Sequence, residues 1–264
     1  MTNNAESPYS FAAFRNRLTV HGTLVALTGL RIGAGRDSDV VGNDLPVLRD
    51  VLGRPLIPGA SLKGALRAQA EGLIRTIAPE QVRDFVETEK FQATEIEALK
   101  NDEDFQGNDR ALSNAIWEHS NLIDMTFGAP WVAGRLFLKD ALVDEQFWHQ
   151  QFEVRNGVAI NRDTETVEGG MLYDYEVVPA GTRFDFELVL EQAEAWQQGM
   201  LLLLLKPWER GEMRVGGFRS RGLGYVRLEH VTRTYATVQS VEDVLALLDG
   251  NVPDVSDEQM QQWR

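Results

Sequence analysis

Residues 57–67 read Ile-Pro-Gly-Ala-Ser-Leu-Lys-Gly-Ala-Leu-Arg, a proline- and glycine-containing loop that leads into a helical pattern. They are the end of a first glycine-rich motif that begins at Arg31. The apolar positions recur every three or four residues and so share one helical face: Leu62, Leu66, Ala70, Leu73 and Ile77. Ser61 is the expected N-cap, and Pro79 is expected to end the helix. The helix start combines free backbone N–H groups with two cations four residues apart, Lys63 and Arg67, a pattern that favours phosphate binding.

Strand patterns flank this helix. Residues 17–32 alternate and are rich in Val, Leu and Thr, and residues 183–191 (RFDFELVLE) have a clean period of two. Further elements are expected as strands at 135–143, 153–160, 172–178 and 224–231, a buried helix at 194–205, and a short helix from Ser240 to Leu248. The core order of strand, helix, strand, strand, helix, strand predicts an α+β fold of the ferredoxin-like βαββαβ type, which RNA-recognition modules share.

Two segments interrupt this core. Residues 80–130 are acidic, polar and mostly helical, which predicts a helical insertion. Residues 156–174 are expected to form a β-hairpin whose polar tip, NRDTETVEGGM, spans 161–171. We therefore predict one domain over residues 1–264, with a frayed tail after Gly250.

The charge is unevenly distributed along the chain. The 264 residues include 26 Lys and Arg and 40 Asp and Glu, a net charge of −14, which argues against a nucleic-acid ligand. Residues 1–78 (nine basic, six acidic) and 194–237 (seven basic, four acidic) are nevertheless each at +3 and contain the glycine-rich motifs. The charge distribution is therefore compatible with a localised basic face on an acidic protein.

Composition also excludes several classes of protein. The absence of cysteine excludes disulfides, thiolate catalysis and cysteine-ligated zinc. The longest apolar run, Met200–Leu205, is too short to span a bilayer, and the polar start of the chain lacks a signal pattern. We expect a cytoplasmic protein with no membrane partner.

A second glycine-rich motif, GGFRSRGLG, occupies residues 216–224. Taken with the first, it makes the sequence resemble the RAMP superfamily of CRISPR-associated proteins, and it is most similar to backbone subunits of type III effector complexes. The stretches that carry the resemblance follow in order: LRIGAG at 30–35, NDLPVLRD at 43–50, PLIPGASLKGALR at 55–67, FG at 127–128, GRLFLKDA at 134–141, AINRDT at 159–164 and the 216–224 loop.

The resemblance implies a guide-RNA-binding subunit of a type III CRISPR ribonucleoprotein that cleaves complementary target RNA in antiviral defence. Its implied partners are guide RNA, target RNA, other effector subunits and further copies of the chain. The hairpin would be a thumb that kinks the duplex. The acidic insertion would be a lid that faces solvent or a protein neighbour. The implied RNA-binding residues are Arg31, Arg36, Ser61, Lys63, Arg67, Arg162, Gly216, Gly217, Arg219, Ser220 and Arg221. Some relatives bind zinc in the lid through Cys and His, and without cysteine we expect no such structural zinc here.

The resemblance also identifies Asp44 as the candidate catalytic residue, because target-cleaving members use an aspartate in the loop after the first strand. A carboxylate with a pKa of about 4 is a weak base, so cleavage assisted by Mg²⁺ or Mn²⁺ is favoured over a lone aspartate. Asp37 and Asp39 are nearby alternatives, and a plain turn residue is the structural alternative for Asp44. Asp50 is expected to pair with a local arginine or backbone N–H.

Three other functions stay open. The chain could be a non-catalytic guide-RNA scaffold of the same complex, or a ferredoxin-like module for a small anionic ligand. A guide-processing endoribonuclease is disfavoured, because such enzymes commonly use histidine and neither glycine motif contains one. The four histidines, at 21, 119, 149 and 230, show no metal-ligand spacing.

Overall fold

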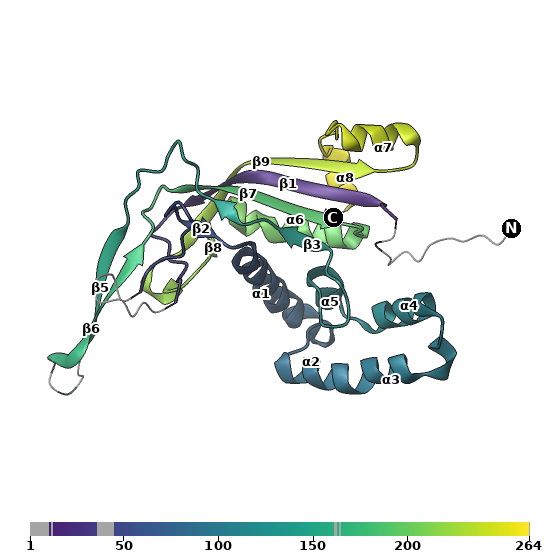
Figure 1. Cartoon of the computed structure of the whole chain (residues 1–264), viewed down its shortest axis with the longest axis horizontal. Coiled ribbons are helices and arrows are strands. Elements are labelled where there is room, and N and C mark those ends of the chain that lie inside the picture. Colours follow the sequence, from purple (N-terminus) through teal and green to yellow (C-terminus); the bar gives the residue numbers. More distant parts are fainter. Residues whose placement is uncertain (1–10, 12, 36–44, 161–162, 164, 264) are drawn as a thin grey trace.

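The computed structural model describes residues 11, 13–35, 45–160, 163 and 165–263. Its centre is a five-stranded antiparallel sheet with the strand order β3-β7-β1-β9-β8 (Figure 1). The strands are β1 (Asn16–Ala26), β3 (Leu136–Leu138), β7 (Arg183–Glu191), β8 (Met213–Arg214) and β9 (Tyr225–Thr237).

Two long helices, α1 (Gly59–Ile77) and α6 (Ala195–Glu209), cover one face of this sheet (Figure 1). Their buried side chains, such as Leu66 and Leu204, share one hydrophobic core with the inward residues of β1 and β7. The order β1, α1, β3, β7, α6, β9 with neighbours β3-β7-β1-β9 is a ferredoxin-like arrangement. The predicted α+β fold is confirmed.

The opposite face of the sheet is polar. Arg17 pairs with Glu191 at 2.7 Å, and Lys139 pairs with Glu187 at 2.6 Å. Because β7 alternates strictly, its phenylalanines and leucines point to the core while Glu187 and Glu191 form these pairs on the other face.

Some predicted boundaries are wrong. Strand β1 ends at Ala26 rather than Ile32, because Leu30 leaves the sheet and exchanges backbone hydrogen bonds with Val178 (2.9 and 2.8 Å). The expected strand at 135–143 is divided into β3 and the short β4 (Ala141–Leu142), which pairs with β2 (Leu56–Ile57). Strand β9 and helix α6 both extend beyond their predicted ends.

The start and the buried face of α1 also differ from prediction. The N-cap is Pro58, and Ser61 lies inside the first turn and caps nothing. The buried stripe of α1 ends at Ile74, whereas Leu73 and Ile77 are exposed, because the buried positions follow the four-residue spacing from Leu62 through Leu66 and Ala70 to Ile74.

The insertion is helical, as its sequence predicts. It consists of η1 (Pro79–Gln81), α2 (Phe85–Phe91), η2 (Gln92–Ile96), α3 (Glu97–Asn101), η3 (Glu103–Phe105), α4 (Asp109–His119) and α5 (Leu122–Phe127). An ion pair holds α5 to the chain after η1, since Arg83 donates to the buried carboxylate of Asp124 at 2.6 Å. Burial raises the pKa of Asp124, and the charge of Arg83 opposes that effect.

A hairpin of β5 (Glu153–Ile160) and β6 (Val167–Val177) projects from the end of the sheet opposite the lid (Figure 1). Because β6 begins at Val167, five residues of the expected polar tip belong to a strand. The short η4 (Arg219–Arg221) lies in the second glycine motif. Among the described residues, no helix is long and apolar enough to cross a bilayer.

The C-terminal segment is folded rather than frayed. It contains α7 (Val241–Leu248) and α8 (Asp257–Gln262). Val255 N donates to Arg233 O at 2.8 Å, and the ring of Trp263 packs edge-on against Tyr235 at 4.9 Å. These contacts with β9 correct the expected frayed tail, whose polar composition hides two anchoring apolar residues.

Candidate nucleic-acid interface

The first glycine motif is fastened to the base of the hairpin. Leu45 N donates to Asp174 O and Leu45 O accepts from Glu176 N, both at 3.1 Å. On the other side of the loop, Ala34 N donates to Pro46 O at 3.2 Å. The chain before residue 36 and the chain after residue 44 are therefore held together beside β6.

A buried carboxylate reinforces this attachment. Both oxygens of Glu176 accept from an Nη of Arg49 at 2.7 Å, and one also accepts from Val47 N at 3.1 Å. The Arg49 guanidinium lies 3.9 Å from the ring centre of Phe152, a cation–π contact. Charge-assisted bonds of this kind are stronger than neutral ones, so the stretch after Asp44 is rigidly positioned.

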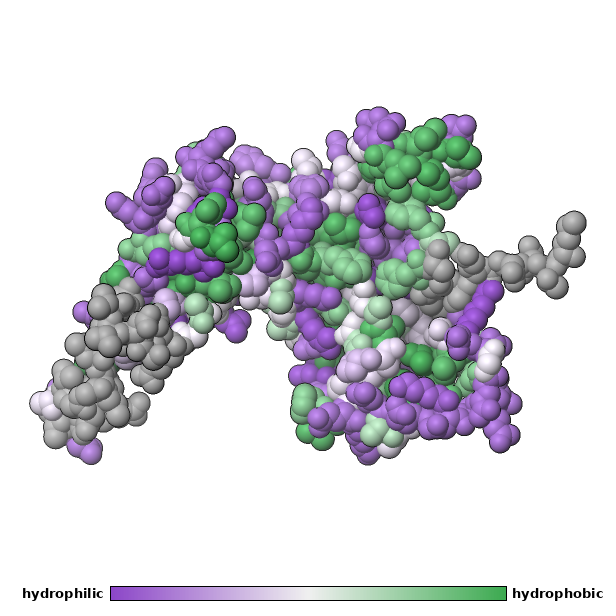
Figure 2. All heavy atoms as spheres, viewed as in Figure 1, coloured by the Kyte–Doolittle hydropathy of each residue, from purple (hydrophilic) through white to green (hydrophobic). Residues whose placement is uncertain are grey.

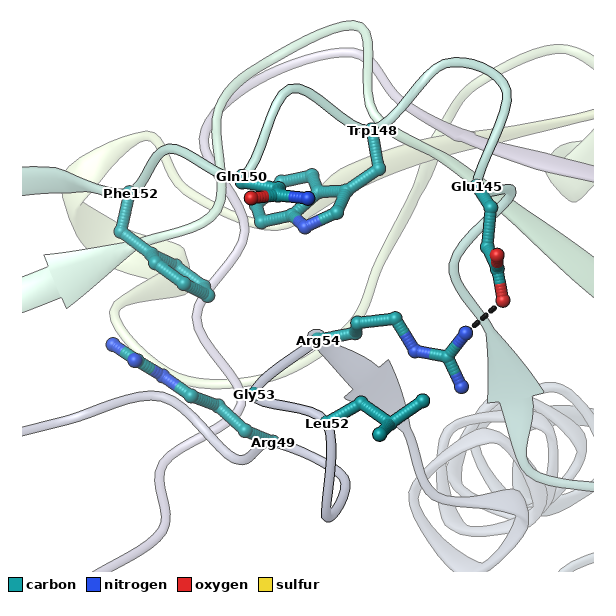
Figure 3. A pocket seen from close by; sticks show the side chains of 8 residues that line it. All are labelled: Arg49, Leu52, Gly53, Arg54, Glu145, Trp148, Gln150 and Phe152. Carbon is teal, nitrogen blue, oxygen red and sulfur yellow. Dashed lines mark hydrogen bonds and ion pairs between the residues drawn. The ribbon is translucent and has the colours of Figure 1, made fainter.

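A cavity of about 540 Å³ lies beside Arg49 (Figure 3). Its second arginine, Arg54, pairs with Asp50 at 2.7 Å and with Glu145. Because both guanidiniums already have carboxylate partners, this cavity offers little attraction to phosphate. The lining residues are Arg49, Leu52, Gly53, Arg54, Glu145, Trp148, Gln150 and Phe152.

The structure brings the two glycine motifs into direct contact. Gly217 N donates to Arg31 O at 2.8 Å. Gly216 has φ +84°, and a Cβ there would lie 2.3 Å from Arg31 O. Glycine is therefore required at position 216 both by the left-handed backbone and by the close approach of the first motif.

Arg31 is the most informative side chain at this junction. Only 9% of the residue is exposed, and its Nε has no hydrogen-bond partner. The described part of the chain gives the guanidinium no hydrogen bond and no ion pair, and its contact is the ring of Phe218 at 5.0 Å. Burial lowers the pKa of Arg31, while Tyr173 and Tyr175 act in the opposite direction. A buried cation without a counter-charge is costly, so this position favours an anion.

Arg221 adds an exposed cation to the same place. It donates to the hydroxyl of Tyr173 at 2.5 Å, which raises the pKa of Arg221, and it lies 4.9 Å from the ring centre of Phe218. Tyr175 packs edge-on against Phe218 at 4.8 Å. We call Arg31, Tyr173, Tyr175, Phe218 and Arg221 the thumb-base cluster. Arg219 and Ser220 are exposed on the adjoining turn.

The cations of α1 divide into two kinds. Arg67 donates to Glu71 at 2.8 Å and to Gly128 O at 2.9 Å, so it ties α1 to the end of α5. Lys63 is half-buried, and burial together with the charge of Arg67 lowers its pKa. No described hydrogen bond or ion pair joins Ser61, Lys63 or Arg67 to the thumb-base cluster.

Several predicted site residues cannot be placed. Asp44, Arg36 and Arg162, and the alternatives Asp37 and Asp39, lie outside the described residues. Asp50 does behave as predicted, since it accepts from Leu52 N and Arg54 N at 2.9 Å and pairs with Arg54. These bonds, that from Arg54 N first, lower the pKa of Asp50.

Sequence reasoning missed the aromatic part of the site. Tyr173 and Tyr175 are two residues apart in a strand and so share one face, which was a usable signal. Phe218 lies within a glycine-rich loop in the sequence, and nothing in the sequence shows that its ring contacts both Arg31 and Arg221.

Comparisons with known proteins agree with this geometry. A family model described as the RAMP superfamily matches residues 23–227, which include both glycine motifs. Proteins named CRISPR system Cms endoribonuclease Csm3 match shorter stretches. The one from Mycobacterium tuberculosis is 53% identical over 53 residues (19% of this chain, 22% of that protein). The one from Methanocaldococcus jannaschii is 41% identical over 58 residues (22% and 23%). The one from Enterococcus italicus is 38% identical over 86 residues (28% and 40%).

These matched segments span less than half the length of each curated relative. The family model, in contrast, covers more than half of this chain, from β1 into β9. It confirms the resemblance predicted from the two glycine motifs. The chain belongs to the RAMP superfamily.

Proposed function

We propose that this chain is the guide-RNA-binding backbone subunit of a type III CRISPR ribonucleoprotein and that it cleaves complementary target RNA. The observation that carries RNA binding is the buried guanidinium of Arg31, which lacks an acceptor among the described residues and lies against the second glycine motif. The names of the relatives support the CRISPR and endoribonuclease parts. A cytoplasmic location and association with other effector subunits and further copies of the chain belong to the same proposal.

The thumb-base cluster suits a phosphate backbone. Arg31 and Arg221 can each donate charge-assisted hydrogen bonds to phosphate oxygens, and Arg219, Ser220 and the backbone of the turn add donors. In this proposal these groups bind phosphates and not base edges. The expected binding is therefore independent of the RNA sequence and strongly dependent on salt. Lys63 would hold a further phosphate from α1.

RNA is expected at the base of the hairpin and not on the open sheet face. That face contains the acidic groups Glu187 and Glu191, already paired with Lys139 and Arg17. A phosphate backbone would have to displace these carboxylates, whereas an anion near Arg31 would pair with a buried charge that has no partner among the described residues.

Asp44 is the proposed cleaving residue. It directly precedes Leu45, which is anchored to β6 by two backbone hydrogen bonds, and it follows a stretch whose start is also held at the hairpin base. Its carboxylate would align the 2′-hydroxyl with the scissile phosphate of a kinked strand.

The described residues contain no group of three or more His, Asp or Glu side chains positioned to hold a metal ion. In this proposal Asp44 would hold a Mg²⁺ or Mn²⁺ ion together with RNA phosphate oxygens, a ligand set that Mg²⁺ accepts. When bound, such an ion would stabilise negative charge on the scissile phosphate.

The test compares wild type with Asp44→Ala, each assembled with guide RNA and partner subunits and given labelled complementary RNA with Mg²⁺ or Mn²⁺, or with EDTA. We expect cuts in wild type that Asp44→Ala loses while target binding persists. Asp37→Ala and Asp39→Ala are the matched controls and should keep cutting.

The other outcomes separate the alternatives. Intact target in every sample, with tight binding, would identify a non-catalytic scaffold. Cutting of a guide precursor instead of the target would identify a guide-processing enzyme. A wild-type protein that binds no RNA would refute the proposal and would favour a module that binds a small anion.

A further inference from the structure

Helix α7 is well defined at both ends. Ser240 Oγ accepts from Asp243 N at 3.2 Å, and Asp243 accepts from Ser240 N at 2.9 Å, which is a complete capping box. At the other end Gly250, with φ +75°, donates to Leu247 O, and Asn251 N donates to Ala246 O at 2.8 Å. These bonds form a Schellman motif. The helix is therefore specified locally, and yet none of its residues is buried.

The apolar side chains of α7 lie on two faces. Ala246 and Leu247 line a hollow of about 120 Å³ against the end of β9. The outer face has the spacing i, i+3, i+4, i+7 and consists of Val241 (70% exposed), Val244 (39%), Leu245 (56%) and Leu248 (76%). Figure 2 shows it as a continuous hydrophobic area on α7. A helix that is apolar on both faces is normally covered on both, so the outer face lacks a partner.

The charge around this face restricts what can cover it. Residues 238–264 contain six acidic residues and one basic residue. The acidic side chains exposed there are Glu242, Asp249, Asp254, Asp257 and Glu258. An RNA backbone would be repelled. Two α7 faces from two copies would bring like charges together, which disfavours a symmetric contact.

We propose that the outer face of α7 docks a protein partner through an amphipathic helix whose apolar stripe is bordered by Lys and Arg. Four apolar anchors at this spacing suit recognition of one helix by another, and the exposed acidic side chains of this segment supply complementary charge. Residues 238–264 lie outside the stretch matched by the family model, and α7 lies at the end of the sheet away from the β5–β6 hairpin (Figure 1). The proposal does not depend on the proposed function.

The test measures fluorescence anisotropy of a labelled 18-residue helical peptide of Leu and Lys with the full chain. Two probes serve as controls: a Ser and Lys peptide of equal charge, and a Leu and Glu peptide. The disruptive variant is Leu245→Lys with Leu248→Lys, because lysine suits the C-terminal end of a helix and repels a basic partner. Leu245→Met with Leu248→Met preserves the apolar face, and Val86→Lys changes an equally exposed residue of α2.

We expect the Leu and Lys peptide to bind at least tenfold more tightly than either control peptide. The double lysine variant should weaken that binding at least tenfold, while the methionine variant and Val86→Lys stay within twofold. The proposal would be overturned if the Leu and Lys peptide bound no more tightly than the Ser and Lys peptide. It would also be overturned if the double lysine variant bound the Leu and Lys peptide as tightly as wild type does. Sedimentation equilibrium showing a dimer that the double lysine variant abolishes would overturn it too, in favour of a second copy as the occupant.

Discussion

Arg31 and Arg135 are both buried arginines, but the protein surrounds them differently. Arg135, just before β3, is 1% exposed, donates to Gln192 O at 2.5 Å and lies 4.4 Å from the ring centre of Trp117. Burial lowers its pKa to about 10. Arg31, at the hairpin base, is buried against Phe218 without such an acceptor among the described residues. Burial alone therefore does not determine what a buried arginine does; the partners of its guanidinium do.

The largest effect is expected from Arg31→Met. Removing a buried cation that has no counter-charge in the described part of the chain should leave the free energy of unfolding unchanged or raise it. Losing charge-assisted bonds to phosphate should weaken RNA binding about 10- to 100-fold. Fluorescence anisotropy with single-stranded RNA at fixed salt, together with urea unfolding, checks both halves. Unchanged affinity would show that Arg31 and Arg135 are alike and that the comparison fails.

Arg135→Met should lower the stability of the protein and leave its RNA affinity unchanged, the opposite of Arg31→Met. It leaves the buried carbonyl of Gln192 without this donor and should lower the free energy of unfolding by about 1–3 kcal/mol. Affinity for the same RNA, measured at a temperature where the variant is folded, should stay within twofold. A loss of affinity in a fully folded sample would place Arg135 in the RNA site.

Lys63 and Arg67 of α1 show the same contrast between a binding and a structural cation, with smaller expected effects. Lys63→Met should weaken RNA binding about fivefold and reduce the slope of log affinity against log salt by about one. Arg67→Met should instead cost about 1 kcal/mol of stability, because Arg67 is bound to Glu71 and Gly128 O. Salt titrations of both variants beside urea unfolding separate the roles. Equal salt slopes in the two variants would contradict the division.

The sequence alone predicted the ferredoxin-like core, because period-two strands and a period-3.6 helix depend on local patterning that β7 and α1 show clearly. The resemblance named Arg31 and not Arg135 as an RNA-binding residue, but nothing in the sequence shows which of the two guanidiniums has a partner. Lys63 and Arg67 were both expected to bind RNA, although the structure gives them different surroundings. These differences come from partners distant in the chain, such as Gln192 and Gly128. The cluster around Phe218 depends on the same long-range contacts, and so does the folding of the tail onto β9.

The smallest expected effect concerns pH and again contrasts Lys63 with the arginines. Burial and the charge of Arg67 lower the pKa of Lys63, so its ammonium loses its proton at a lower pH than an ordinary lysine. Only the protonated form attracts phosphate, and the contribution of Lys63 to affinity should therefore decline as pH rises towards that lowered pKa. The probe is 2′-O-methyl RNA, which resists alkaline hydrolysis, and the readout is anisotropy across alkaline pH. Lys63→Arg should flatten the decline, because a guanidinium stays charged over this range. An identical decline in wild type and Lys63→Arg would mean that Lys63 does not contact the RNA and that the lysine belongs with Arg67 among the structural cations.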